Sequence, residues 1–443
     1  MHCDNTEHLL RAEASRVECE LRAQDEAWGT SGWTRRRFIA GAGMVGAAAL
    51  ASQLVTTRVA YAATAPGTTA APTNTLITIF LRGAADGLRL LVPRSSALGG
   101  DYLQQVRSGL VPSDGELIAL PGTSGWGLNA AAKPLYDLLW QTGELAFVPA
   151  VSANGISRSH FQAQQYVDKG GSDAATSGWL DRALAQLGPG TTFRAVGMGT
   201  AEPFSLVGSQ RKIVVESLKN FQFPGWDEIR PQSQRAVAKL YRGMDGVLGA
   251  DVPATMAALA EAGKLRARSG VRNGAKYPDG DFAGALQDLA TMLRAEAGLQ
   301  VATIDVGGWD THTDERWDFD QQLGATAQAL SAFMTDLGPA RRKRVTVVVV
   351  TEFGRRVAMN ASGGTDHGHG SVAWLLGGGL SGSGVLGKWA PLDGGSAQNG
   401  DVPGLNNVFD LLGELAHKRL GVGSLSKVFP GHSYAPLGIA RSN

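Results

Sequence analysis

Residues Val345–Thr351 read V-T-V-V-V-V-T, an unbroken β-branched run without the polar alternation of a half-exposed strand. A strand of this composition is buried on both faces, which is typical of a parallel sheet covered by helices on both sides. Comparable apolar runs lie at Thr75–Leu81 and Val301–Val306, and shorter ones lie at 145–148, 193–198 and 372–376. The sequence therefore predicts a central sheet with neither face open to water.

The segments between these runs show the period of amphipathic helices. Apolar residues recur at three and four positions in 129–142, 233–268, 282–293 and 319–337, and Gly338-Pro339 is expected to end the last of these helices. Strands alternating with such helices predict an α/β fold, a three-layer α/β/α sandwich with a mainly parallel sheet. We expect one domain over 75–443, with a helical insertion around 205–275.

The N-terminal region has the pattern of an export signal. Thr34 opens the stretch T-R-R-R-F-I, which matches the twin-arginine consensus, and an apolar, Gly-rich run follows at 39–55. Ala60-Tyr61-Ala62 then supplies an A-x-A cleavage pattern. We expect 1–62 to be a twin-arginine signal peptide with a long charged n-region, and 63–74 to be a linker. The alternative, an uncleaved membrane anchor, is disfavoured because the run is short for a span of about 20 residues.

These signals predict a periplasmic or extracellular protein that meets the twin-arginine translocon during export and is not inserted in the membrane after cleavage. The formal net charge of +1 gives no indication of nucleic-acid binding. Both cysteines, Cys3 and Cys19, precede the cleavage site. The mature chain therefore has no disulfide, no thiolate nucleophile and no cysteine-based metal site.

Polar residues follow several of the predicted strands, where α/β proteins bind their ligands. These segments are R-G-A-A-D-G at 82–87, S-R-S-H-F at 157–161, G-G-W-D-T-H at 307–312 and E-F-G-R at 352–355, and G-T-D-H-G-H-G at 364–370 precedes another strand. Of the six histidines outside the leader, four lie in these segments, namely His160, His312, His367 and His369. His417 and His432 do not, and we interpret them as structural or surface residues.

Carboxylates and imidazoles without sulfur suit Zn, Mn, Mg or Ca. The candidate metal ligands are Asp86, Asp310, His312, Glu352, Asp366, His367 and His369. Ser159, or Ser157, opens a helix, where an anionic transition state is favoured, and either is a candidate nucleophile. Arg355 or Arg158 is a candidate for orienting a leaving oxyanion.

Each of these residues also has a structural interpretation. Asp86 can cap a turn, and Ser157 or Ser159 can be a helix N-cap. Glu352 can simply pair with Arg355 or Arg356. The segment 310–312 is harder to explain in this way, because three polar side chains that follow a buried strand must be satisfied by some partner.

Taken in order, R-G-x-x-D-G-L, S-R-S-H-F, G-G-W-D-T-H, T-E-F-G-R and G-T-D-H-G resemble the bacterial family called domain of unknown function 1501, over essentially the whole mature chain. That family is grouped with the alkaline phosphatase and sulfatase superfamily. The resemblance implies an α/β/α sandwich around a site for one or two divalent metal ions.

The resemblance also implies roles for individual residues. Asp86 resembles the first metal aspartate, and Ser159, less so Ser157, stands where the superfamily keeps its nucleophile. Asp310 and His312 resemble the Asp/His pair of the first metal site, and His367 resembles the last histidine ligand. Glu352 stands where an Asp-His pair is expected; because Phe353 follows it, a second-site imidazole is missing unless His369 or Asp366 replaces it.

We therefore expect an exported metal-dependent hydrolase of a phosphate ester or related anionic ester. In it Asp310, His312 and His367 hold one metal, and Asp86 and Glu352 hold a second if it is present. A formylglycine sulfatase is disfavoured because neither serine stretch fits its motif, and a G-x-S-x-G elbow is absent. The alternative is a non-catalytic, metal-stabilised protein of the envelope or secretion machinery.

Overall fold

The computed structural model describes residues 74–442, except 154, 156, 224–227, 246 and 396–399. The predicted signal peptide 1–62 lies outside the described residues, and so does the predicted linker apart from Asn74. Within the described part of the chain, no helix is both long and apolar enough to cross a membrane.

The main sheet of the described residues has nine strands. Its order is β11 (Gly384–Val385), β5 (Leu145–Ser152), β10 (Ser371–Gly377), β9 (Val345–Thr351), β1 (Thr75–Leu81), β8 (Val301–Val306), β6 (Ala195–Met198) and β7 (Ile213–Val215), and β12 (Asn406–Asn407) also pairs with β5. β1 lies at the centre, parallel to both β8 and β9. The three long runs predicted from the sequence are therefore adjacent strands.

β10 is the strand that breaks the parallel pattern, because it pairs antiparallel with both β5 and β9. The amino end of β10 consequently lies at the same edge as the carboxyl ends of its neighbours. This reversal brings the segment that precedes β10 to the edge where the polar segments after β5, β8 and β9 also end.

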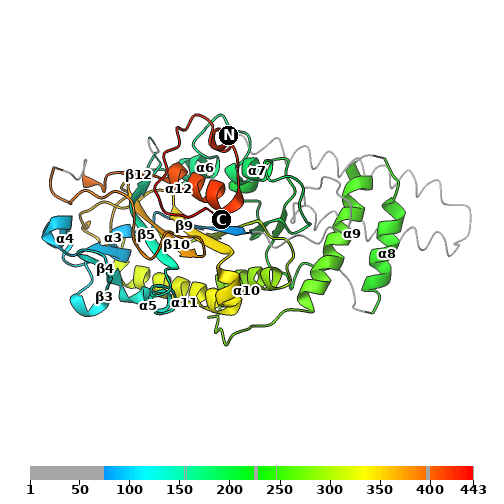
Figure 1. Cartoon of the computed structure of the whole chain (residues 1–443), viewed down its shortest axis with the longest axis horizontal. Coiled ribbons are helices and arrows are strands. Elements are labelled where there is room, and N and C mark those ends of the chain that lie inside the picture. Colours follow the sequence, from blue (N-terminus) through cyan, green and yellow to red (C-terminus); the bar gives the residue numbers. More distant parts are fainter. Residues whose placement is uncertain are drawn as a thin grey trace, which may run out of the picture.

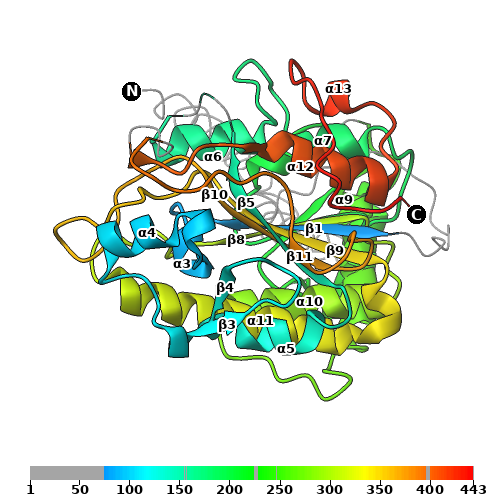
Figure 2. The ribbon, with the colours of Figure 1, turned by 60° about the vertical axis from the view of Figure 1, so that its left-hand side comes forward.

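Both faces of the sheet are covered, as the composition of the strands predicts. In β1, Ile77, Ile79 and Leu81 belong to one core cluster, whereas Leu76 and Phe80 belong to the other. Figure 2 shows α5 (Lys133–Leu139), α10 (Asp281–Arg294) and α11 (Glu315–Arg342) on one side of the sheet, and α6 (His160–Asp168), α7 (Trp179–Leu184) and α12 (Val408–Leu415) on the other. The predicted three-layer fold class is confirmed.

Smaller elements complete the described chain. They are α3 (Gly87–Leu90), α4 (Gly100–Arg107), α13 (Leu425–Val428) and a separate antiparallel sheet of β2 (Leu91–Pro93), β4 (Trp126–Asn129) and β3 (Leu117–Ala119). The region predicted as a helical insertion contains β7, α8 (Arg230–Tyr241) and α9 (Val247–Arg266). α8 and α9 lie side by side and project from one end of the sandwich (Figure 1).

The predicted helix end at Gly338-Pro339 coincides with a break within α11, where two helical segments meet at a kink. Gly338 adopts a left-handed φ of 70°, which kinks the helix, but helical structure resumes and continues to Arg342. Pro339 is compatible with this arrangement because proline fits the first turn of a helix, where its missing N–H is not required.

Candidate metal centre

Three side chains from three different elements meet at the carboxyl edge of the sheet. His160 is the first residue of α6, Asp310 follows β8, and His367 precedes β10. We call them the His/Asp cluster. Among the described residues, these are the groups whose ligand atoms lie within 4.8 Å of one another, close enough to share one ion.

The ligand atoms of the His/Asp cluster are closely and evenly spaced. The Nε2 atoms of His160 and His367 are 3.0 Å apart. Asp310 places Oδ2 at 3.4 Å from His160 Nε2 and Oδ1 at 3.3 Å from His367 Nε2. Ligands about 2.0–2.1 Å from a tetrahedral Zn²⁺ stand roughly 3.3 Å apart, so this spacing fits the edges of a metal coordination shell.

The second ring nitrogen of each histidine fixes its tautomer. His160 Nδ1 lies 2.7 Å from Glu352 Oε1, and His367 Nδ1 lies 3.0 Å from the carbonyl oxygen of Arg158. An ionised carboxylate and a carbonyl only accept, so in both rings Nδ1 carries the hydrogen. The two Nε2 atoms therefore face each other at 3.0 Å, a geometry that either a shared proton or a metal ion between them would satisfy. Metal-binding histidines usually have such acceptors behind them.

His312 adds a third imidazole at the edge of the cluster. Its Nε2 lies 2.9 Å from His367 Nε2 and 3.1 Å from Asp310 Oδ1. Behind it, Nδ1 is 3.7 Å from Oδ1 of Asp366, an exposed carboxylate that also accepts from Asn360. His312 is therefore placed as a further ligand, and Asp366 lies behind it instead of facing the cluster.

Glu352 is fully buried and supports His160. Its Oε1 accepts hydrogen bonds from His160, from Gln164 Nε2 at 2.8 Å and from the Gly83 N–H at 2.9 Å. Burial raises the pKa of the Glu352 carboxyl, but the bonds from His160 and Gln164 outweigh burial and hold the pKa at about 2. The ionised Glu352 in turn raises the pKa of His160. Glu352 thus acts behind the cluster and orients one of its rings.

Arg355 holds Asp310 in place from inside the protein. It is fully buried and donates to the carbonyls of Ala84, Gly83 and Thr365, and its Nη2 lies 2.6 Å from Asp310 Oδ1. Burial alone would raise the pKa of the Asp310 carboxyl, but Arg355 lowers it below its usual range. The role of orienting a leaving oxyanion, predicted for Arg355 or Arg158, does not fit this contact, because the Arg355 guanidinium binds the Asp310 carboxylate.

The glycines of the polar segments permit close backbone contacts around the cluster. Gly83 has φ +122°, and a Cβ there would lie 2.5 Å from the backbone nitrogen of Asp310. A Cβ on Gly368, next to His367, would lie 2.4 Å from the carbonyl carbon of Arg355. Neither position tolerates a side chain without moving a residue of the site.

Asp86 has its contacts away from the His/Asp cluster. It is buried, caps α3 by accepting from the Leu88 N–H, and forms an ion pair of 2.5 Å with Arg107. Glu315 lies close to it; burial, and then the charge of Asp86, raise the pKa of Glu315 to about 9. Arg107, Asp86 and a protonated Glu315 form a compact buried group, and metal binding by Asp86 stays a prediction.

The other predicted residues divide between the site and its surroundings. His369 turns away from the cluster, with Nε2 3.0 Å from Ser152 Oγ. Ser159 is the N-cap residue of α6, but its side chain makes no capping hydrogen bond. Ser157 is exposed and accepts from the Ser159 N–H. The Ser159 side chain, which is half-buried and precedes His160 in the sequence, therefore makes no hydrogen bond to the backbone of α6.

Sequence reasoning placed His160 in a polar segment but gave it no ligand role, and it missed Gln164, Arg107 and Glu315. His160 and Gln164 are four residues apart, so they share one face of α6, and this spacing was a usable signal. Arg107 and Glu315 come from α4 and α11, and nothing in the local sequence links them to Asp86.

The comparisons with known proteins give a family. A family model described as protein of unknown function (DUF1501) matches residues 150–425. The chain belongs to this family. The matched range contains every residue of the His/Asp cluster, whereas Asp86 and Arg107 precede it. No curated protein matches the sequence.

Several solved structures are similar to this DUF1501 chain at low identity. The lipoteichoic acid synthase LtaP from Listeria monocytogenes has 10% identity and a TM-score of 0.36, over 84% of this chain and 77% of that one. The C-terminal periplasmic domain of EcEptC from Escherichia coli, in complex with Zn, has 9% identity and a TM-score of 0.33, over 70% and 74%. Alkaline phosphatase from the Antarctic bacterium TAB5 has 10% identity and a TM-score of 0.27, over 69% and 92%.

Proposed function

We propose that this protein is an exported metal-dependent hydrolase of phosphate esters or related anionic esters. The observation that carries the proposal is the pair of facing Nε2 atoms of His160 and His367, with the Asp310 carboxylate beside them. Their spacing fits a divalent ion, and both rings have hydrogen-bond acceptors behind them.

Each residue of the site has a distinct proposed role. His160, Asp310 and His367 would hold the ion, with His312 as a fourth ligand, which favours one metal over two. When bound, the ion supplies a Lewis acid for a phosphoryl oxygen. Glu352 keeps the His160 ring in its tautomer, and Arg355 keeps the Asp310 carboxylate ionised and in position.

Ser159 is the proposed nucleophile, at the amino end of α6, where the helix dipole favours negative charge. Its oxygen would bond to phosphorus while the bond to the alcohol breaks, and its proton would leave to solvent. Water would then release the phosphate and restore the serine. Arg158, which precedes Ser159 in the sequence, has a side chain that is 44% exposed and paired with Asp401.

Metal analysis combined with an ester panel tests the proposal. The mature protein, purified without chelator, is expected to carry about one ion per chain. It should hydrolyse p-nitrophenyl phosphate or bis(p-nitrophenyl) phosphate in preference to p-nitrophenyl sulfate. Ser159→Ala should remove this activity and keep the metal, whereas Ser157→Ala should keep both. A wild-type protein without stoichiometric metal contradicts the proposal.

The second candidate is a metal-stabilised protein without catalysis. One observation favours it: Glu352 and Arg355, both predicted to act in the site, are completely buried and used for support. A protein that binds one ion per chain, loses thermal stability with chelator and leaves every ester of the panel intact would give this function preference.

A further inference from the structure

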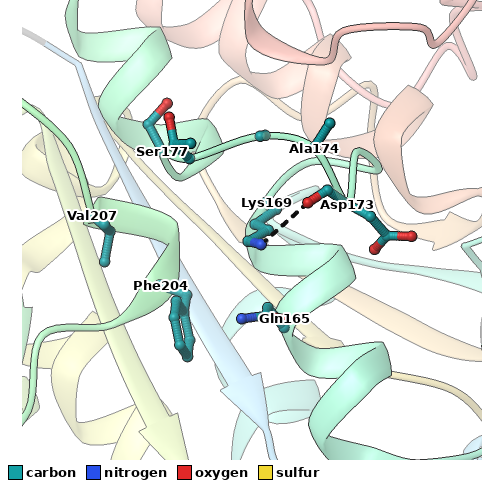
Figure 3. A pocket seen from close by; sticks show the side chains of 9 residues that line it. Gln165, Lys169, Asp173, Ala174, Ser177, Phe204 and Val207 are labelled. Carbon is teal, nitrogen blue, oxygen red and sulfur yellow. Dashed lines mark hydrogen bonds between the residues drawn. The ribbon is translucent and has the colours of Figure 1, made fainter. Parts of the chain in front are cut away.

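A cavity of about 380 Å³ lies beside the carboxyl end of α6. Its lining includes Gln165 of α6, the C-cap residue Lys169, Ala174 and Ala175 of the following loop, and Phe204 and Val207 on the opposite side. Figure 3 shows the ends of the Gln165 and Lys169 side chains directed toward the side of Phe204, while the carboxylate of Asp173 points away. The volume is within the range of small-molecule sites, about 300–1,000 Å³.

Two polar side chains of this cavity, Lys169 and Gln165, have little hydrogen bonding within the described part of the chain. The Lys169 ammonium has one weak contact, at 3.4 Å to the carbonyl of Asp173, and no carboxylate of the described residues pairs with it. Within the same described part of the chain, the Gln165 amide has no side-chain hydrogen bond. The rest of the wall is largely apolar, and Phe204 is 50% exposed. A cation and an amide beside an exposed ring suit an anion carried on an aromatic or similar apolar group.

α6 links this cavity to the candidate metal centre. His160 and Gln164 lie on the face of the helix that contacts Glu352. Phe161, Gln165 and Lys169, each four residues apart, lie on the neighbouring face, and Phe161 is 86% exposed. At 1.5 Å per residue, the polar groups of the cavity lie about 8 to 14 Å along the helix from His160.

We propose that this cavity binds the far end of the substrate. This inference rests on the proposed function and narrows the substrate class. The substrate is then an anionic ester whose alcohol portion extends along α6 and ends in a second anionic group, carried on a ring that packs against Phe204. Lys169 and Gln165 recognise that anion, and the His/Asp cluster holds the ester group.

Two matched esters and one probe test the inference. The esters are an aryl phosphate built on biphenyl with a carboxylate on the far ring, and its counterpart with a methyl group at that position. The probe is the corresponding hydroxybiphenyl carboxylate, which has no phosphate and is titrated by calorimetry in the presence of chelator. The proteins are the wild type, Lys169→Met and the control Lys133→Met, at an exposed lysine of α5 that pairs with Asp137.

The wild type is expected to bind the probe, and Lys169→Met should weaken binding about five-fold, as for one partly exposed ion pair. Lys133→Met should bind as the wild type does. In the hydrolysis assay, the wild type should prefer the carboxylate ester, and Lys169→Met should lose that preference through KM. Equal probe affinity in the wild type and Lys169→Met, or no binding by the wild type, overturns the inference. If neither ester is cleaved, the proposed hydrolase function fails. The titration in the presence of chelator still shows whether the cavity binds the anionic probe.

Discussion

At the residue scale, the site depends on which ring nitrogens carry hydrogen. Glu352 and the Arg158 carbonyl bind the Nδ1 atoms of His160 and His367, so the two Nε2 atoms have lone pairs available for a cation. Glu352 can do this because its pKa is about 2, and it stays ionised throughout the physiological pH range. The buried Glu352 carboxylate therefore determines which nitrogen of the His160 ring carries the hydrogen and which one can bind a cation.

Removing a cluster residue should remove the ion. His160→Ala, Asp310→Ala and His367→Ala are each expected to lose most of the bound metal, because removing one of the four proposed ligands greatly lowers the affinity of the site. His417→Ala and His432→Ala are the controls, since these rings bond to the Val422 carbonyl and to Asp410 outside the site. The measurement is the metal content per chain by mass spectrometry. Full metal content in His160→Ala would contradict the proposal that His160 is a metal ligand.

Glu315 should make the stability of the fold depend on pH. Burial, and then the charge of Asp86, raise its pKa from 4.5 to about 9 in the folded protein. The folded state therefore holds a proton that the unfolded state releases. This contribution is fully present below about pH 4.5 and is lost as pH rises toward about 9.

Glu315→Gln removes that titration while keeping a neutral side chain of the same shape. Urea unfolding between pH 6 and pH 9 should therefore show a shallower fall in unfolding free energy for Glu315→Gln than for the wild type. Glu296→Gln, at a glutamate whose side chain is 58% exposed, should retain the wild-type slope. Identical slopes for the wild type and Glu315→Gln would mean that Glu315 is ionised in the folded protein.

At the scale of elements, the loop before β10 is positioned by backbone contacts. Gly368→Ala should displace this loop, because the new Cβ would lie 2.4 Å from the Arg355 carbonyl carbon. The expected result is a lower melting temperature together with weaker metal binding, since His367 is the preceding residue. Gly284→Ala in α10 is the matched control, because a Cβ there has no neighbour within 4 Å. It should be neutral or stabilise by up to about 1 kcal/mol.

The elements around the site were predictable to different degrees. Val345–Thr351 and Val301–Val306 match their strands residue for residue because an unbroken apolar run has one stable location, the inside of a covered sheet. The antiparallel direction of β10 was not predictable, since an apolar strand has the same pattern in both directions. The ligand role of His160 depends on the rotation of α6, and the pairing of Asp86 with Arg107 depends on the packing of α4.

At the scale of the whole molecule, the sandwich gathers residues from the entire described chain at one edge. The segments that follow β5, β8 and β9 lie at this edge. The segment that precedes β10 lies there too, because β10 runs in the opposite direction. His160 and His367 are 207 residues apart in sequence, and their side chains meet only when the sheet is assembled. A metal site of this kind is complete only in the folded protein, so an ion bound before export requires a route that carries folded chains.

The predicted export route can be tested on the precursor. Arg35→Lys combined with Arg36→Lys should leave the full-length protein in the cytoplasm, because the motif is recognised as paired arginines and lysine lacks the planar, bidentate guanidinium. Both residues lie outside the described residues, so the expectation rests on the sequence motif alone. Cell fractionation with detection of precursor and mature forms is the measurement, and Arg37→Lys, at the variable position of the motif, is the matched control. Mature protein outside the cytoplasm at wild-type level in the double variant would refute twin-arginine export. Precursor retained in the cytoplasm with its metal bound would show that loading precedes transport.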